Sequence, residues 1–387
     1  MFLQNAISKR INDNNPVKVA LIGAGKFGSM FLSQVPSTLG IEVLVIADLK
    51  PDNAVKACKN VGWSDDLINK TKFVDRGTDA IKLNEVEVVI EATGFPAAGI
   101  EHARQAFQNG KHIIMVNVEA DVLAGAALVK EANSAGVVYS MAYGDQPALT
   151  AEIVEWARAS GFNVTSAGKG TRYQPIYHKS SPDTVWDYYG LTHEEAKKAG
   201  MNPKMFNSFL DGTKSGLEMA AIANACDLDV PTNGLLFPPC GMDDLANVLK
   251  PIKAGGFLEK NGQVEVVSSL ERDGRPVFKD LRWGVFAVLE APNDYAASCF
   301  KQYGMNTDDT GKFSAMYKPF HLIGMELNIS VFSAALLNQA TGQTKKFTGD
   351  VVSTTKTILK KGEILDGEGG ATAVSYTHLT LPTKQDV

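Results

Sequence analysis

Residues 167–175, AGKGTRYQP, gather cationic and hydroxyl side chains on a glycine-rich stretch directly after a strand-like run, FNVTSA. Arg172 offers a fork of N–H donors suited to a phosphate or carboxylate, and Lys169 offers a compact positive charge. Lys169 is also a candidate acid that protonates a carbonyl oxygen during reduction. The glycines on both sides of Lys169 favour a flexible bend around a substrate-binding pocket, to which Tyr173 would also belong; an ordinary solvated loop is the alternative.

The composition of the chain argues that such an anion site is local. The 387 residues carry a net charge of −5, so neither nucleic acid nor an anionic membrane is an expected partner. No apolar run approaches the ~20 residues that a membrane helix needs, and the N-terminal stretch lacks the pattern of a signal peptide. We therefore expect a cytoplasmic protein. The four cysteines and six histidines are scattered without metal-ligand spacing.

Two further stretches carry candidate catalytic or substrate-binding groups. In LDGTKSGLEMA, Lys214 and Glu218 are four residues apart and would share a helix face near whose start Asp211 lies. The segment is either a capped helix with an exposed ion pair or the carrier of a catalytic Asp211–Lys214 pair. In KPFHLIGMELN, His321 lies among apolar residues. It is either a hydrogen-bonded core residue or a substrate-facing histidine.

A nucleotide-binding fingerprint lies near the N-terminus. VALIGAGKFG places Gly23, Gly25 and Gly28 in a G-x-G-x-x-G pattern between a strand and a helix, with Lys26 and Phe27 between the last two glycines. The first glycine permits the tight turn, the second lets the backbone approach a pyrophosphate, and the third lets the helix pack closely on the strand. Free N–H groups at the helix start would bind the phosphates. A glycine turn without nucleotide is the alternative.

Residues at the ends of the following strands bear on the cofactor. Asp48 follows Gly28 by twenty positions and would bond a ribose 2′-hydroxyl, as in NAD, whereas the nearby Lys50 could meet the 2′-phosphate of NADP. Thr93 and Gly94 end the EATG motif, where small residues let the cofactor lie across the strand end. Asn117 could contact the nicotinamide ribose or amide, or it could only form a turn. The choice between NAD and NADP stays open.

The secondary-structure elements that must position these groups follow two different patterns along the chain. Through Ala148, strand-like runs alternate with helical segments of 10–15 residues, which predicts a doubly wound parallel sheet, the Rossmann α/β fold, over residues 1–148. Residues 149–344 mix helices with alternating strands and predict an α+β catalytic and dimerisation domain. Residues 345–374 become basic, then strand-like and Gly-rich, and would begin a small β-rich domain.

The last residues form a separate case. SYTHLTLPTK within residues 375–387 resembles a translated sequencing-adapter segment, so this stretch is interpreted as a non-native tail on a naturally longer protein. An ordinary terminal strand is the alternative.

The motifs together resemble a known superfamily. GAGKFG, EATG and VNVEADV are similar to the nucleotide domain of the homoserine dehydrogenase superfamily. GKGTRYQP, SPDTVW, NSFLDGTKSGLEMA, GLLFPP and KPFHLIGMEL resemble its branch of 1-deoxy-D-xylulose 5-phosphate reductoisomerase-like oxidoreductases, and LKKGEILDGEGG resembles the start of a SAF-type domain. The chain departs from homoserine dehydrogenase proper in lacking a GTTNY-type segment and an ACT-like tail.

This resemblance implies a homodimeric NAD(P)H-dependent reductase acting on a carbonyl of a small anionic substrate, of which a sugar phosphate is an example. Lys169 and Arg172 would hold the substrate anion, and Asp211, Lys214 and His321 would line the same cleft. If isomerisation also occurs, a divalent cation (Mg²⁺ or Mn²⁺) would bridge substrate oxygens, with ligands that the sequence does not identify. The alternatives are a homoserine dehydrogenase and a dinucleotide-binding regulator without turnover.

Overall fold

The computed structural model describes residues 3–379, with side chains described as far as Ser375. The chain divides into two compact units, the first formed by residues 3–152 and 321–346, the second by residues 153–320 and 347–379. Residues 321–346 thus cluster with the N-terminal unit, whereas the sequence pattern groups them with residues 149–344. The domain boundaries expected from the sequence stay predictions.

The first unit is built on a six-stranded sheet in the order β3-β2-β1-β4-β5-β6. Every neighbouring pair in this sheet is parallel. This order, with β1 and β4 at the centre, is that of the doubly wound dinucleotide-binding fold, so the predicted fold class of this unit is confirmed. The strands are β1 (Val17–Ile22), β2 (Ile41–Ala47), β3 (Lys72–Val74), β4 (Val88–Glu91), β5 (His112–Met115) and β6 (Tyr139–Met141).

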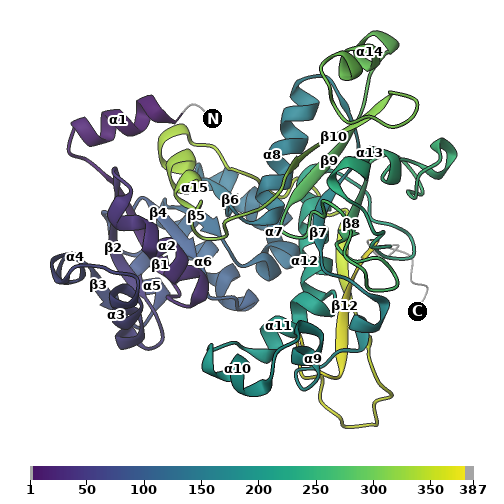
Figure 1. The fold of residues 1–387 in the computed structure, drawn as a ribbon. Helices are drawn as coiled ribbons and strands as arrows, with labels where there is room; N and C mark the ends of the chain where they lie inside the picture. Colours follow the sequence, from purple (N-terminus) through teal and green to yellow (C-terminus); the bar gives the residue numbers. More distant parts are fainter. Residues whose placement is uncertain (1–2, 380–387) are drawn as a thin grey trace, which may run out of the picture. The chain divides into compact units, whose positions relative to one another are not determined.

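Helices connect these strands, as the alternation in the sequence predicts (Figure 1). The longest, α7, begins after the capping residue Asn117, has acidic Glu119 and Asp121 in its first turn, and ends at the left-handed Gly136. The helical elements of this unit are α1 (Gln4–Asn12), α2 (Lys26–Gln34), η1 (Val35–Ser37), α3 (Pro51–Asn60), α4 (Asp65–Lys70), α5 (Gly77–Ile81), α6 (Pro96–Gln108), α7 (Val118–Ala135), the start of α8 (Gln146–Ala159), α15 (Asn328–Phe332) and η5 (Ser333–Leu337).

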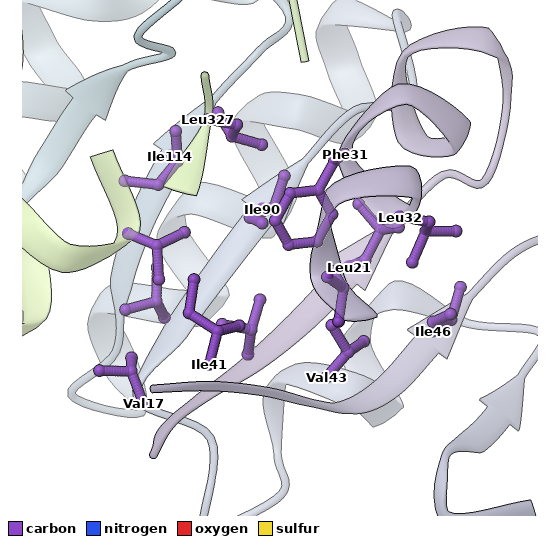
Figure 2. Packing of buried hydrophobic residues seen from close by; sticks show 14 of the residues in the cluster. Val17, Leu21, Phe31, Leu32, Ile41, Val43, Ile46, Ile90, Ile114 and Leu327 are labelled. Carbon is purple, nitrogen blue, oxygen red and sulfur yellow. The ribbon is translucent and has the colours of Figure 1, made fainter. Parts of the chain in front are cut away.

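The core of the first unit has a layer on each side of the sheet. Figure 2 shows one layer, in which Leu21 of β1 and Ile90 of β4 lie beside Phe31 of α2. Leu327 belongs to the same layer, so the returning segment 321–346 completes the core of this unit. The other layer packs α5, α6 and α7 against the opposite face of the same strands. Because both faces are covered, the strands read as continuous apolar runs.

The second unit contains a four-stranded mixed sheet in the order β10-β9-β7-β8. The β7–β8 pair is parallel, and β9 pairs antiparallel with both β7 and β10. This arrangement confirms the α+β class expected for the second part of the chain. The strands are β7 (Asn163–Thr171), β8 (Gln263–Ser268), β9 (Val285–Glu290) and β10 (Phe313–Lys318).

The helices of the second unit are mostly short, and the 14-residue α12 packs against β7 and β8. A separate apolar cluster joins α9, α10 and α11 around Trp186 and Leu210. The helical elements are η2 (Pro175–Lys179), α9 (Val185–Tyr189), α10 (His193–Lys198), α11 (Pro203–Leu210), α12 (Thr213–Cys226), η3 (Met242–Asp244), α13 (Leu245–Val248), η4 (Ile252–Ala254) and α14 (Asp294–Gln302).

The C-terminal segment forms an antiparallel hairpin of β11 (Gly349–Thr355) and β12 (Ala373–Leu379). The hairpin packs on α12, and Figure 1 shows β12, in yellow, beside this helix. The interpretation of residues 345–374 as the start of a SAF-type domain stays a prediction, as does the tail of residues 375–387, of which residues 380–387 lie outside the described part of the chain. Among the described residues, no helix has the length and apolarity that crossing a membrane requires.

Candidate functional site

The glycine loop between β1 and α2 has the geometry of a phosphate-binding turn. Gly23 has φ +98°, and a Cβ on it would lie 2.6 Å from the carbonyl oxygen of Ala92. A Cβ on Gly28 would lie 2.4 Å from the carbonyl oxygen of Gly23, so this glycine lets α2 pack against the loop. A Cβ on Gly25 would meet nothing within 4 Å, so open space lies beside the residue that precedes α2. A pyrophosphate at the helix N-terminus fits this space.

The two residues between Gly25 and Gly28 occupy the first turn of α2. Lys26 is exposed and Phe27 is half-buried. The cofactor contacts expected of both residues stay predictions.

Asp48, directly after β2, is tied to the loop by both carboxylate oxygens. Its Oδ2 accepts the backbone N–H of Ala24 at 3.2 Å, and its Oδ1 accepts the backbone N–H of Lys50 at 2.9 Å. The side chain of Lys50 is exposed. Rotation of the Asp48 carboxylate away from the loop would break both hydrogen bonds, which limits the movement that a 2′-phosphate beside it would require.

A buried polar group lies where β4 and β5 end. Glu91 is fully buried, and its Oε1 accepts the Thr93 hydroxyl at 2.5 Å and lies 3.3 Å from Nδ1 of His102. Among the residues that the structure describes, its Oε2 has no hydrogen-bond partner, and neither has Nδ2 of the buried Asn117. Both atoms lie near the position that a Cβ on Gly99 would take, at 3.3 and 3.0 Å. Sequence reasoning missed Glu91, although the EATG motif contains it.

The candidate cofactor residues at these strand ends differ in exposure. Thr93 and Gly94 are exposed, and Gly94 has φ +68°. The Oδ1 of Asn117 accepts the backbone N–H of Ala120 at 3.1 Å and caps α7. The turn-forming role of Asn117 is therefore present, and its cofactor contact stays a prediction.

In the second unit, Lys169 lies within β7 and is buried. Its ammonium forms an ion pair with the carboxylate of Glu218 on α12, which is also buried. Glu218 thus contributes to a buried charge pair rather than to the exposed ion pair with Lys214 that the helical spacing suggests. A helical period shows that two residues share a face, but not that this face is turned toward a lysine of a neighbouring strand.

The two glycines beside Lys169 serve close packing, and the flexible bend expected there is absent. β7 continues through Thr171, and neither glycine has a positive φ. A Cβ on Gly168 would lie 1.9 Å from the carbonyl oxygen of Glu265, and one on Gly170 would lie 1.8 Å from that of Leu281. Glycine is required at both positions because the neighbouring backbones approach so closely. The solvated-loop alternative fails for the same reason.

Arg172 and Tyr173 follow β7 directly. Arg172 is half-buried, and its buried Nε has no hydrogen-bond partner within the described part of the chain. Tyr173 is buried, stacks on Phe237 with ring centroids 4.1 Å apart, and its hydroxyl lies 3.1 Å from Nε2 of His178. Burial lowers the pKa of His178, whose Nδ1 lies 2.7 Å from the carbonyl oxygen of Asp211.

Asp211 lies at the start of α12, as the sequence predicts, and it is fully buried. Its Oδ1 accepts the backbone N–H of Thr213 at 2.8 Å, and its Oδ2 accepts a hydrogen bond from Nζ of Lys356 at 2.6 Å. Lys214 is half-buried in the first turn of α12. The Asp–Lys pair that the structure shows at Asp211 therefore includes a lysine 145 positions away, which no local spacing could indicate.

His321 opens the segment that returns to the first unit, and it is half-buried. This segment packs on α2, because a Cβ on Gly324 would lie 2.7 Å from Cβ of Met30. Lys169, Arg172, Tyr173, Asp211 and Lys214 belong to the second unit, whereas His321 belongs to the first together with the predicted cofactor residues. Its substrate contact stays a prediction.

A divalent cation finds no matching set of ligands in the described part of the chain. Within residues 3–379, no three His, Cys, Asp or Glu side chains gather so that they could hold a metal ion. The carboxylates nearest the candidate catalytic groups, Glu218 and Asp211, are each paired with a lysine.

Comparisons with known proteins agree with this division of roles. Residues 23–142 match the family model of the homoserine dehydrogenase NAD binding domain, and residues 144–327 match that of the oxidoreductase DRL catalytic domain. The dinucleotide-binding domain expected from the glycine fingerprint is confirmed. No curated protein sequence matches the chain.

Solved structures give more distant matches. A homoserine dehydrogenase from Thiobacillus denitrificans is 14% identical, with 95% of this chain and 92% of that chain covered and a TM-score of 0.48. The myo-inositol dehydrogenase from Lactobacillus casei, in complex with NAD(H) and myo-inositol, is 17% identical, covering 44% and 50% with a TM-score of 0.34. KijD10, a 3-ketoreductase from Actinomadura kijaniata, is 16% identical, with 42% of this chain and 49% of that chain covered and a TM-score of 0.31. The match thus spans about half the length of the last two proteins.

The glycine loop, Asp48 and the parallel sheet make up the first of these domains, and Lys169, Arg172 and Asp211 lie within the second. One part of the chain is thus similar to a homoserine dehydrogenase NAD binding domain and the next to an oxidoreductase DRL catalytic domain, and together these matches indicate an NAD(P)-dependent oxidoreductase.

Proposed function

We propose that the chain reduces a carbonyl group of a small phosphorylated substrate, as a 1-deoxy-D-xylulose 5-phosphate reductoisomerase-like oxidoreductase. The observation that carries this proposal is the buried Lys169–Glu218 pair in the unit that matches the DRL catalytic domain. A lysine ammonium kept charged by a buried carboxylate can donate a hydrogen bond, and then a proton, to an oxygen that gains negative charge.

The roles of the side chains follow from their contacts. A nicotinamide bound in the first unit would supply or accept the hydride. Lys169 would orient the substrate carbonyl and protonate its oxygen, and Glu218 would hold the ammonium in place. Arg172, with its unsatisfied Nε, would bind the anionic end of the substrate. Positioning of both ends of the substrate supplies much of the rate enhancement in such reactions.

The geometry of Asp48 supports NAD as the preferred cofactor. Both of its carboxylate oxygens hold backbone amides, so it would present a fixed negative charge to a 2′-phosphate and an acceptor to a 2′-hydroxyl. Titration of the chain with NADH and with NADPH, followed by nicotinamide fluorescence, tests this preference. Tighter binding of NADPH would contradict it.

The activity itself is tested by offering the purified chain 1-deoxy-D-xylulose 5-phosphate and aspartate semialdehyde in parallel, with NADH and with NADPH. Loss of the reduced-nicotinamide absorbance with the sugar phosphate is expected. The match to a homoserine dehydrogenase NAD binding domain makes homoserine dehydrogenase the second candidate, and oxidation with the semialdehyde alone would establish it. Cofactor binding without consumption over a panel of carbonyl compounds would instead indicate a regulator.

The resemblance to the reductoisomerase-like branch also supports a homodimer that binds its small anionic substrate without nucleic acid or membrane. Light scattering of the purified chain tests this assembly, for which a mass near 83 kDa, twice the 41.6 kDa of one chain, is expected. A mass near that of one chain at all concentrations would contradict it.

A further inference from the structure

Two arginines flank the point where the β7–β9 ladder ends, Arg172 directly after β7 and Arg282 in the turn before β9. In this antiparallel pair Lys169 lies opposite Val285, and the backbone N–H of Gly170 donates to the carbonyl oxygen of Gly284 at 3.0 Å. Beyond this pair the ladder gives way to a turn over residues 281–284, in which the backbone N–H of Gly284 donates to the carbonyl oxygen of Leu281 at 2.9 Å. Arg282 lies in this turn, and Arg172 lies directly after the end of β7. The two chains stay close here, because a Cβ on Gly170 would lie 3.0 Å from the backbone nitrogen of Arg282.

Neither guanidinium is satisfied by the protein. Within residues 3–379, the side chains of Arg172 and Arg282 form no hydrogen bond and no ion pair, and Nε of Arg172 is buried. The carboxylate closest in sequence, Asp280, accepts the backbone N–H of Arg282 at 2.8 Å. The guanidinium of Arg282 lies over the ring of Trp283, 4.5 Å from its centroid. This contact orients the arginine but supplies no negative charge.

The surroundings make the unsatisfied pair costly. Both arginines are half-buried, and burial lowers the pKa of Arg282, with the positive charge of Arg172 lowering it further. Burial raises the pKa of the nearby Tyr189 on α9, while the charges of Arg282 and Arg172 act in the opposite direction. Two like charges in a partly desolvated setting repel each other. An anion between them would remove this repulsion and satisfy the donors.

We propose that Arg172 and Arg282 form a two-arginine cradle that binds the phosphoryl group of the substrate. The proposal rests on the proposed function and adds Arg282 to Arg172 as the second group that holds the phosphoryl end of that substrate. A phosphate dianion offers enough oxygens for two guanidinium forks, whereas a carboxylate satisfies one. Lys169 is not part of the cradle, because its ammonium is engaged with Glu218.

The test measures binding without turnover. Isothermal titration of the full chain with glycerol 3-phosphate, with and without NADH, gives the affinity of the cradle for a phosphate monoester. Arg172→Ala and Arg282→Ala are each expected to weaken binding about ten-fold or more. Arg275→Ala serves as the matched control, since Arg275 is exposed and pairs with Asp273 at 2.7 Å, and it is expected to leave the affinity unchanged.

A folding readout accompanies the titration. Because each arginine repels the other, removing one is expected to leave the thermal unfolding midpoint of the free protein unchanged or raised, and phosphate-induced stabilisation is expected to disappear. Unchanged glycerol 3-phosphate affinity in Arg282→Ala would overturn the cradle, and so would equally tight binding of lactate. If the wild type binds the phosphate through both arginines but turns over no carbonyl compound, the proposed function fails while the cradle stands. Turnover of 1-deoxy-D-xylulose 5-phosphate by the wild type, with an unchanged KM in Arg172→Ala and Arg282→Ala, would give the reverse result.

Discussion

The ammonium of Lys169 in β7 is paired with the carboxylate of Glu218 in α12, and both side chains are buried. Burying two charges costs solvation free energy, which mutual attraction offsets only when the geometry is good. A hydrophobic pair of similar volume would often be equally stable. The pair is therefore better explained by a charged lysine at this strand than by stability, and this explanation can be tested by substitution.

Replacing Lys169 with methionine should remove the proton donor. The turnover number is expected to fall about 10²- to 10⁴-fold, while the dissociation constant of the cofactor stays unchanged because the glycine loop belongs to the other unit. Steady-state kinetics and cofactor fluorescence titration measure the two quantities. The single variant leaves Glu218 buried without its partner, at a cost of about 3–5 kcal/mol, so the Lys169→Met/Glu218→Gln double variant is the folded control. Wild-type turnover in that double variant would rule out the role proposed for Lys169.

Glu218 is expected to act as a positioning residue. In Glu218→Gln the lysine loses its anionic partner, so the turnover number should fall about ten-fold or more while KM changes little. Glu218→Asp keeps the charge and is expected to restore part of the rate, which a purely structural role would not predict. A larger KM with an unchanged turnover number would instead assign Glu218 to substrate binding.

Substitutions of two glycines in the loop before α2 are expected to affect different properties, cofactor binding for one and stability for the other. Gly25 has φ −71° and ψ −156° and free space around its Cβ position, so Gly25→Ala is expected to fold normally and to weaken NADH binding by filling the pyrophosphate space. In Gly28→Ala the new Cβ would meet the carbonyl oxygen of Gly23 at 2.4 Å. This variant should lose stability, by about 1–3 kcal/mol. Urea unfolding and fluorescence titration compare them; equal NADH affinity in Gly25→Ala and wild type would contradict this account of the loop.

Local patterns predicted what local physics determines. The alternating strands and helices of the first unit, the turn at Gly23 and the position of Asp211 at a helix start all depend on neighbours a few residues away, and the structure has them where the sequence indicates. Gly168 and Gly170 were interpreted as a bend because a sequence shows that a side chain is absent but not what fills its place. Here two neighbouring backbones fill it.

The spacing of residues along the sequence could not predict which side chains far apart in the chain would pair. Glu218 lies 49 positions from Lys169, and Lys356 lies 145 positions from Asp211. Arg282 comes near the end of β7 only because the turn before β9 packs against Gly170, more than 100 positions earlier in the sequence. Such pairs are fixed by tertiary packing. A glutamate within an otherwise small and apolar helical run, LEMAAIANAC, was the one local signal that a charge is buried on α12.

Stability should fall as the pH rises through neutrality because of Glu265. Burial raises the pKa of this carboxyl from 4.5 to about 7, although three backbone N–H groups, those of Val266, Leu236 and Phe237, act against the shift. A raised folded-state pKa stabilises the protein below the unfolded-state value of 4.5, and this contribution is lost as the pH rises through about 7. The full effect is on the order of 3 kcal/mol at about 1.4 kcal/mol per pKa unit.

Chemical unfolding between pH 5 and pH 8, measured on wild type and Glu265→Gln, checks this slope. The glutamine carries no titratable proton, so its slope between pH 6 and pH 8 should be flatter than that of wild type. Asp121, whose pKa burial raises to about 6, contributes in both proteins at the acidic end of the range. Identical slopes throughout would show that Glu265 does not titrate in this range.

The Asp211–Lys356 pair ties the C-terminal segment to the second unit, and its removal tests whether Asp211 has a structural or a catalytic role. Nζ of Lys356 donates to Oδ2 of Asp211 at 2.6 Å and to the carbonyl oxygens of Ser180 and Gly370 at 2.7 and 2.8 Å. Lys356→Met should cost about 3–5 kcal/mol because it leaves Asp211 buried without its cation. Lys260→Met, which breaks an exposed pair with Asp229 at 2.7 Å, should cost at most about 1 kcal/mol.

A double variant then separates the two roles of Asp211. Lys356→Met/Asp211→Asn removes both buried charges and should recover much of the stability lost in Lys356→Met. If Asp211 takes part in the reaction, turnover stays low in this folded double variant; if Asp211 only anchors the segment, turnover returns together with stability. Urea unfolding and steady-state kinetics on the same preparations decide between them, and equal costs for Lys356→Met and Lys260→Met would show that the buried pair does not anchor the segment at all.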